Sequence, residues 1–339
     1  MQAKKVYIIA EAGVNHNGSL EMAFQLIDKS KEIGADCVKF QTFKAAQIVT
    51  ASSPKASYQL KVTDAKESQF DMLKKLELQK EDFKKLKDYC QTKQIDFMST
   101  PYNFEDADLL NDIGVDTFKI ASGQIAELPF LKYVAAFKKR MIVSTGMADM
   151  QEVEAAVHAM REAGNNNIVI LQCNTDYPSK IEDTNLLAMI TMRDKLNVHV
   201  GYSCHVPNNY ACFAAVALGA EMIEKHFTLD KNLPGPDHSC SLEPQEFKDL
   251  IDGIRNTEKC LGTGVKTPSE SEQKNTYGMR RSLVAKTNIK AGTVITQEHI
   301  AFKRPMNGLS PNYLERVLGK KIKIDLQQDE PFTLTSVDL

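Results

Sequence analysis

The sequence predicts a (β/α)₈ barrel followed by a small C-terminal β-rich domain. Eight short apolar runs recur over roughly the first 230 residues, and amphipathic segments with helical periodicity lie between them. Alternation of strands and helices at this spacing is typical of βαβ units and a parallel sheet. The chain of 339 residues also has room for one barrel of roughly 250 residues and a second, smaller domain.

The apolar runs are expected to form the barrel strands in chain order. They lie at residues 6–13, 37–43, 96–101, 117–123, 141–147, 168–178, 198–205 and 222–228. Nearly every run ends in polar, chemically useful residues. The carboxyl ends of the strands are where such a barrel places its active site, so we expect these residues to share one site.

Helices are expected between the strands. The helical segments include 19–35, 80–94, 104–114, 150–164 and 243–262, and three of them end at Gly34, Gly114 and Gly164. More than 50 residues separate the second and third strands. An excursion of this length is usually a lid or a binding loop on the active face.

Domain boundaries follow from a change in composition. The barrel domain is expected at 1–262, a polar linker at 263–279, and the small domain, with short β-like runs and turns, at 280–339. A domain of this size is marginal alone, so we expect it to pack on something.

Bulk composition excludes several protein classes. The formal net charge of −2 gives no basic field for nucleic acid, and no run approaches the roughly 18 apolar residues that cross a membrane. Seven cysteines without a CxxC pair argue against a disulfide framework and a structural zinc site. Glu11 interrupts the first apolar run, which we interpret as a strand and not a secretory signal. A cytoplasmic protein is expected.

Two histidines end the seventh and eighth predicted strands. His205 and His226 would lie within a few ångströms of each other, and neutral imidazoles suit a divalent metal that acts as a Lewis acid. The alternative is two unrelated structural histidines. His16, after the first strand, is a weaker third candidate.

Two lysines interrupt apolar strand runs, where burial without a partner is costly. Lys39 and Lys119 would point at a shared anion from the second and fourth strands, and Ser122, Ser144 and Ser203 add hydroxyl donors on the same rim. Such a set binds phosphate or carboxylate. Ordinary interior ion pairs, such as Lys39 with Glu11, are the alternative.

Three acids complete the candidate site. Glu11 and Glu224 lie within apolar runs, where one could act as a general base and the other could orient a lysine or a ligand. Asp237 lies in the loop LPGPDHS after the eighth strand. Rigid loops of this kind position polar groups, although a plain turn aspartate is an equal alternative.

Ordered motifs along the chain resemble those of the sialic acid synthase family, which comprises N-acetylneuraminate synthase and relatives that make legionaminic or pseudaminic acid. The motifs are IIAEAGVNHNGS, VKFQTFKA, STP, FKIASG, STGM, CNTDYP, GYSCH, EKHFTLD and PGPDHS. The last 60 residues, including KRPMNG, resemble the family's antifreeze-like (SAF) domain. The resemblance implies a (β/α)₈ barrel with that domain at its C-terminus.

What the resemblance implies for the site can be stated by position. His205 and His226 match histidines that hold a divalent metal, usually Mn²⁺, with Mg²⁺ or Co²⁺ as alternatives. The residues matched to phosphoenolpyruvate binding are Lys39, Lys119, Ser122, Ser144, Thr175 and Ser203. Glu11, Lys39 and Lys119 match catalytic positions. The residues matched to the sugar side are Gln41, Gln124, Tyr177, Asp237 and Arg304, the last reaching the N-acyl group from a partner subunit in a domain-swapped homodimer.

Three departures from the family pattern bear on which sugar the enzyme uses and on the rate of its reaction. The family commonly reads S-D-H-T where this chain has Ser203, Cys204, His205 and Val206. Gln124 stands where SGE is usual, which removes a charge from the sugar side. CNTDYP resembles the legionaminic-type and some enterobacterial sialic acid enzymes more than the CTNxYP form.

The resemblance implies an N-acetylneuraminate synthase, which condenses phosphoenolpyruvate with open-chain N-acetylmannosamine. Alternatives are a legionaminic acid synthase that uses 2,4-diacetamido-2,4,6-trideoxymannose, a synthase acting on phosphorylated sugars, and a non-catalytic sugar-binding relative. The sequence does not distinguish the two acylated sugars, because they differ mainly at C4 and C6.

Overall fold

The computed structural model describes residues 5–56, 59–64 and 66–339, and the chain forms two compact units that divide between Thr263 and Gly264. The first unit is a closed barrel of eight parallel strands in sequence order, which confirms the predicted fold. Its strands are β1 (Tyr7–Gly13), β2 (Cys37–Thr42), β3 (Asp96–Pro101), β4 (Thr117–Ile120), β5 (Arg140–Ser144), β6 (Ile168–Cys173), β7 (His199–Cys204) and β8 (Met222–His226).

Closure of the barrel joins its first and last strands. β1 pairs with β8 in parallel, and Glu11 lies opposite His226 in this register. On its other side β1 pairs with β2, where Glu11 lies opposite Lys39. Three candidate site residues from distant parts of the sequence therefore occupy neighbouring positions at the carboxyl end of the barrel.

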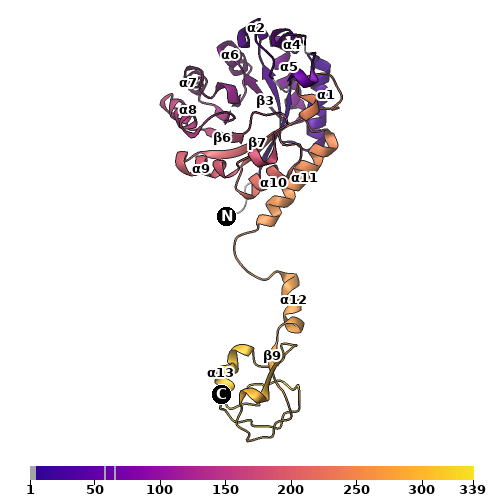
Figure 1. Ribbon diagram of the computed structural model, residues 1–339, viewed down its shortest axis with the longest axis vertical. Helices are drawn as coiled ribbons and strands as arrows, with labels where there is room; N and C mark the ends of the chain where they lie inside the picture. Colours follow the sequence, from indigo (N-terminus) through magenta and orange to yellow (C-terminus); the bar gives the residue numbers. More distant parts are fainter. Residues whose placement is uncertain (1–4, 57–58, 65) are drawn as a thin grey trace. The chain divides into compact units, whose positions relative to one another are not determined.

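Helices surround the strands of the first unit (Figure 1). They are α1 (Leu20–Ile33), α5 (Lys80–Lys93), α6 (Phe104–Asp112), α7 (Leu128–Ala136), α8 (Met150–Glu162), α9 (Leu187–Leu196), α10 (Tyr210–Ala217) and α11 (Pro244–Leu261). α1 ends as predicted at Gly34, whose φ of 90° lies in the left-handed region that glycine adopts without strain. None of the described helices is long and apolar enough to cross a bilayer.

The long excursion between β2 and β3 is not structureless. It contains the short helices α2 (Ala45–Ile48), α3 (Gln59–Val62) and α4 (Gln69–Lys75) before α5 begins. Lys55 is buried in this segment, where its Nζ atom lies 2.8 Å from the carbonyl oxygen of Asp64 and 3.2 Å from Glu67 Oε2. These contacts join two parts of the excursion to each other.

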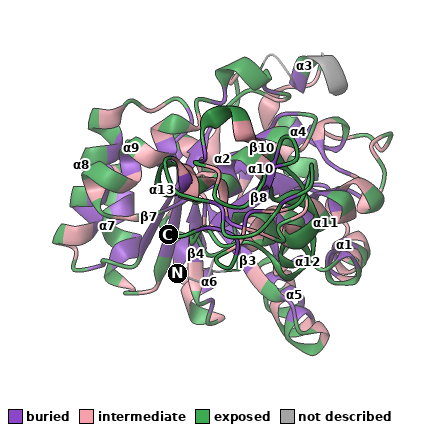
Figure 2. Ribbon diagram, turned by 90° about the horizontal axis from the view of Figure 1, so that it is seen from below, coloured by how far each residue is buried: buried purple, intermediate pink, exposed green. Residues whose placement is uncertain are grey.

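Apolar packing in the barrel unit forms two layers. The larger layer lies between the strands and the helices, as the buried inner faces in Figure 2 illustrate. The smaller one fills the barrel interior with Ile9, Cys37, Met98, Ile142, Val169, Leu171 and Met222. Interior side chains from many strands make the barrel a filled core and not a pore.

The second unit has its own small core. An antiparallel pair of strands, β9 (Ser282–Ala285) and β10 (Ile300–Lys303), and the helix α13 (Leu314–Val317) enclose a cluster that includes Leu283, Val317 and Phe332.

The segment predicted to be a linker contains the helix α12 (Glu270–Met279). Ser269 caps this helix by accepting a hydrogen bond from the backbone N–H of Glu272. None of its residues is buried, so it has no apolar face that hydrophobic periodicity could have revealed.

The replacement Asp106→Asn is expected to stabilise the protein at neutral pH. Asp106 is 3% exposed in the first turn of α6, and its Oδ2 has no hydrogen-bond partner among the described residues. Burial raises the pKa of this carboxyl from 3.8 to about 6. The protonated carboxyl fits the buried site, whereas the ionised carboxyl is unfavourable there. The contribution of Asp106 to the free energy of unfolding is therefore complete below its ordinary pKa and is lost as pH rises through about 6. The Tm gain of Asp106→Asn should be larger at about pH 7.5 than at about pH 4.

Thermal unfolding at the two pH values checks this expectation. The exposed Asp112 of the same helix offers a control for the substitution itself, because Asp112→Asn does not remove a buried carboxyl. A Tm gain of Asp106→Asn that does not grow with pH would contradict the assigned cost of ionising a buried carboxyl.

Candidate active site

A cavity of 460 Å³ opens at the carboxyl ends of the barrel strands. Every strand contributes to its lining, through Glu11, Lys39, Gln41, Thr100, Lys119, Ser144, Cys173, Ser203, Glu224 and His226. The residues for which the sequence predicts chemistry at the strand ends therefore converge on one site.

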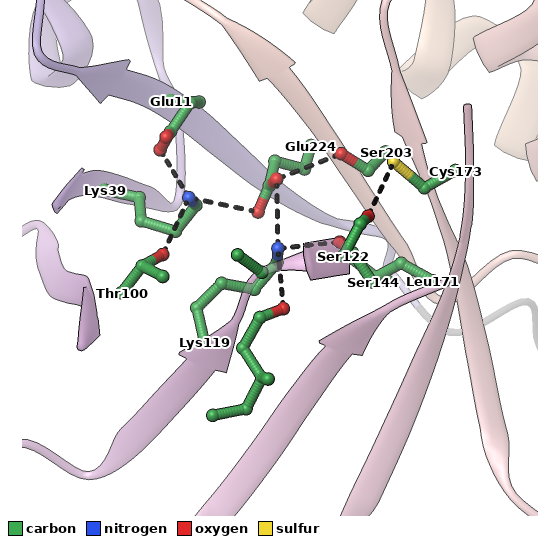
Figure 3. Close-up of polar contacts among 12 residues, drawn as sticks. Glu11, Lys39, Thr100, Lys119, Ser122, Ser144, Leu171, Cys173, Ser203 and Glu224 are labelled. Carbon is green, nitrogen blue, oxygen red and sulfur yellow. Dashed lines mark hydrogen bonds and ion pairs between the residues drawn. The ribbon is translucent and has the colours of Figure 1, made fainter. Parts of the chain in front are cut away.

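A buried network of charges forms the floor of this cavity (Figure 3). Lys39 Nζ lies 2.6 Å from Glu11 Oε2 and 3.8 Å from Glu224 Oε2. Lys119 Nζ lies 3.5 Å from Glu224 Oε1. Glu224 thus joins the two lysines. They form interior ion pairs, which was one alternative from the sequence, and they also line the cavity, while anion binding stays a prediction.

Hydroxyl groups extend this network. Lys119 donates to Ser144 Oγ at 2.7 Å, and Ser203 Oγ donates to Glu224 Oε1 at 3.0 Å. Lys39 donates to Thr100 Oγ1 at 3.4 Å. The two ammonium groups are held between carboxylates on one side and hydroxyls on the other, so each has a fixed direction.

The network sets the charge state of its members. Burial alone would raise the pKa of Glu224, but the ammonium groups of Lys119 and Lys39 lower it to about 2. Burial lowers the pKa of Lys119, and Glu224 opposes that change. Burial raises the pKa of Glu11 although Lys39 opposes it. A buried carboxyl with a raised pKa suits proton transfer near neutral pH.

Ser122, Gly146 and Thr175 form a small cradle beside the floor. Ser122 Oγ accepts a hydrogen bond from the backbone N–H of Gly146 at 3.0 Å. A Cβ atom at Gly146 would lie 2.1 Å from Thr175 Oγ1 and 2.8 Å from Ser122 Oγ. Only glycine lets the chain approach these two hydroxyl groups this closely, and Ser122 and Thr175 both line the cavity.

His205 and His226 lie side by side at the rim, with ring centroids 5.3 Å apart. His205 Nδ1 lies 2.7 Å from the carbonyl oxygen of Asn174. Because a carbonyl can only accept, Nδ1 carries the proton, which in the neutral imidazole leaves the lone pair on Nε2. His226 Nδ1 is buried and has no hydrogen-bond partner among the described residues, and Asp237 Oδ2 lies 4.0 Å from it.

This donor set fits a divalent cation that takes its other ligands from substrate and water. Two imidazole nitrogens with available lone pairs are typical metal ligands. Within the described part of the chain, no group of three or more His, Cys, Asp or Glu side chains could hold a metal. The arrangement therefore differs from a closed structural site, in which the protein supplies all ligands.

Four of the residues expected on the sugar side, Gln41, Gln124, Tyr177 and Asp237, line the cavity. Gln41 Nε2 donates to Glu11 Oε1 at 3.2 Å, and the Tyr177 ring centroid lies 4.1 Å from that of His205. Asp237 also lines the cavity, and burial raises its pKa to about 7. Arg304 belongs to the second unit, directly after β10, so its contact with the sugar stays a prediction.

Gln124 presents an unsatisfied donor. It is 4% exposed and lines the cavity, and its Nε2 group has no hydrogen-bond partner among the described residues. Its Oε1 accepts from the backbone N–H of Ala121 at 3.4 Å. A buried amide N–H without a partner is costly, so this group is available to a ligand that offers an acceptor.

The long excursion lines the cavity, as the sequence predicts, but the sequence did not identify which of its residues do so. This wall combines the apolar residues Ile48, Val49 and Leu73 with the amides Gln59 and Gln69. Gln69 Nε2 donates to Gln59 Oε1 at 3.3 Å. These residues carry no periodic signal, and only the folded loop brings them to the site.

Two histidines near the site have structural roles. His16 is 1% exposed, and its Nδ1 accepts from the backbone N–H of Gly18 at 3.0 Å. His238 Nδ1 lies 2.7 Å from Thr228 Oγ1, which fastens the loop that carries Asp237. The weaker metal candidate, His16, is not among the cavity-lining residues.

Comparisons with known proteins agree with this geometry. Residues 26–266 match the NeuB family, and residues 280–338 match the SAF domain. The chain is 47% identical to an N,N'-diacetyllegionaminic acid synthase of Campylobacter jejuni, over 96% of this chain and 98% of that protein. It is 41% identical to the enzyme of the same name from Legionella pneumophila, over 94% of this chain and 91% of that protein.

A solved structure is also similar. The N-acetylneuraminic acid synthetase of Leptospira borgpetersenii, solved with citrate, superposes with a TM-score of 0.70 at 34% identity and covers 80% of this chain and 90% of its own. The family match spans most of the barrel, and both legionaminic relatives align along nearly their full length. The chain therefore belongs to the NeuB family and ends in a SAF domain.

Proposed function

We propose that this enzyme is a phosphoenolpyruvate-dependent synthase that makes N,N'-diacetyllegionaminic acid from 2,4-diacetamido-2,4,6-trideoxymannose. The observation that carries the reaction type is the buried network of Glu11, Lys39, Lys119 and Glu224, which lies next to the adjacent imidazoles of His205 and His226. It offers cations for a phosphate and a carboxylate, next to imidazoles that would hold a metal ion able to polarise an aldehyde.

Each residue of the floor has a role in this proposal. Lys39 and Lys119 bind the anionic groups of phosphoenolpyruvate, together with Ser122, Ser144, Thr175 and Ser203. C3 of phosphoenolpyruvate attacks the aldehyde carbon, and the aldehyde oxygen takes up a proton. Water adds at C2, and C–O cleavage expels phosphate. Glu11 positions that water and accepts its proton, while Glu224 keeps both lysines in register.

His205 and His226 would hold the divalent cation, with Mn²⁺ as the proposed ion and Mg²⁺ or Co²⁺ as alternatives. When bound, the ion would act as a Lewis acid on the aldehyde oxygen. The hydrogen bond from His205 to Asn174 fixes that ring and its tautomer before any ligand arrives.

The proposed sugar follows from the wall of the cavity and from the relatives. The trideoxy sugar carries a methyl group at C6 and an acetamido group at C4, where N-acetylmannosamine carries hydroxyls. Ile48, Val49 and Leu73 offer apolar surface to a methyl group. The unsatisfied Nε2 of Gln124 offers a hydrogen bond to an amide carbonyl. The 47% identity with the Campylobacter jejuni enzyme supports the same choice.

N-acetylneuraminate synthesis is the second candidate. The Leptospira borgpetersenii protein named for that activity is 34% identical to this chain. For either sugar we propose that Arg304 completes the site from a partner subunit, in a domain-swapped homodimer.

Phosphate release from phosphoenolpyruvate with Mn²⁺ tests the sugar. We expect kcat/KM for 2,4-diacetamido-2,4,6-trideoxymannose to exceed that for N-acetylmannosamine by about 10- to 200-fold, the range that one apolar group contributes in a fitted pocket. The reverse preference would make this an N-acetylneuraminate synthase. Arabinose 5-phosphate and erythrose 4-phosphate serve as controls, and turnover of either would move the enzyme to the synthases of phosphorylated sugars.

A further inference from the structure

A buried lysine on β8 lies outside the cavity. Lys225 is 2% exposed, between Glu224 and His226, which both line the cavity. Because side chains alternate along a strand, Lys225 points away from the cavity and toward the helices. No carboxylate in the described part of the chain forms a salt bridge with it. A buried cation in such a position needs strong acceptors.

Three acceptors surround its ammonium group. Lys225 Nζ lies 2.6 Å from the carbonyl oxygen of Val206, 3.0 Å from that of Asn208 and 3.2 Å from Cys204 Sγ. A lysine has three N–H donors, so these contacts use all of them. The two carbonyls belong to the turn that follows β7, and Cys204 lies opposite Lys225 in the strand register.

These acceptors bracket His205. Cys204 precedes it and Val206 follows it, and its own carbonyl oxygen accepts from the backbone N–H of Ser179 at 3.0 Å. His226 directly follows Lys225 on β8. One side chain therefore ties the segment that carries the first imidazole to the strand that carries the second.

We propose that Lys225 is a positioning residue that fixes the separation of the His205 and His226 imidazoles, with Cys204 as the weakest of its three acceptors. The inference rests on the proposed use of these imidazoles as metal ligands. Polar groups that hold metal ligands in place typically change metal affinity by about 10- to 100-fold when removed.

Replacements of Cys204 can strengthen or remove one of the three contacts of Lys225. A cysteine sulfur is a weaker hydrogen-bond acceptor than a carboxylate. Cys204→Asp should strengthen the contact with Lys225, whereas Cys204→Ala should remove it.

The experiment measures binding of Mn²⁺ to the full-length protein by the EPR signal of the free ion, with and without phosphoenolpyruvate. We expect Lys225→Met to weaken Mn²⁺ binding by about 10- to 100-fold and Cys204→Ala to weaken it less. Cys204→Asp should bind at least as tightly as the wild type. Cys204→Ala added to Lys225→Met should have no further effect, because the two residues act through one contact.

Lys55→Met is the matched control, since Lys55 is equally enclosed but is bonded within the excursion between β2 and β3. It should lower Tm and leave Mn²⁺ affinity unchanged. Unchanged affinity in Lys225→Met, an equal loss in Lys55→Met, or a loss in Cys204→Asp as large as in Cys204→Ala would overturn the positioning role. If Lys225→Met does not fold, the two Cys204 variants decide. A wild type that binds no Mn²⁺ under either condition would overturn the proposed function and this inference with it.

Discussion

Replacing His226 with alanine is expected to lower kcat for phosphate release by at least ~1000-fold, and replacing His205 should do the same. Lewis-acid stabilisation of developing charge contributes several kcal/mol, and each ~1.4 kcal/mol changes the rate tenfold. His226 has a buried ring nitrogen without a hydrogen-bond partner among the described residues, so truncating the ring removes little besides the proposed ligand. The fold should therefore survive the change.

The measurement is phosphate release with saturating phosphoenolpyruvate and sugar after repletion with Mn²⁺. Wild-type enzyme stripped with a chelator should lose activity and regain it on addition of Mn²⁺, whereas the alanine variants should regain none. His158, exposed on α8, provides a control replacement that should leave kcat unchanged. Full activity of either variant after repletion with Mn²⁺ would contradict the assignment of these imidazoles as metal ligands.

The sequence predicts those candidate site residues whose positions follow from the geometry of the barrel strands. In a parallel barrel every carboxyl end meets at one face, so a polar residue at the end of an apolar run is placed without knowledge of the loops. Glu11, Lys39, Lys119 and the two histidines all converged for this reason. Side chains alternate between the two faces of β8, so Glu224 faces the cavity and Lys225 does not. Which of the two faces the cavity follows from the strand register.

The parts that the sequence did not reveal depend on irregular or exposed structure. The wall formed by Ile48, Val49 and Leu73 comes from short helices in a long excursion, where no periodicity links a residue to a face. The helix α12 has no buried residue, so nothing in its pattern distinguishes it from a polar linker. The proposed role of Arg304 depends on how two subunits would be arranged, which the sequence pattern of one chain does not contain.

Glu11→Gln is expected to lower kcat by about 100- to 10,000-fold, the usual contribution of a positioned general base. Glutamine keeps the size of the side chain and its ability to accept from Gln41, but it cannot take a proton from water. It also removes a negative charge 2.6 Å from Lys39, so the lysine faces the anionic substrate with less competition. The KM for phosphoenolpyruvate should therefore stay the same or fall.

This separation of kcat from KM distinguishes a base from a residue that only binds substrate. Steady-state phosphate release over a range of phosphoenolpyruvate concentrations measures both constants, and Glu81→Gln, on the exposed side of α5, is the control for the substitution itself. Raised KM with unchanged kcat would instead mean that Glu11 acts by holding Lys39 in place. In that case Glu224, which contacts both lysines, would also be interpreted as a residue that holds them in place. The group that activates water would then have to be another carboxyl of the cavity, beginning with Asp237.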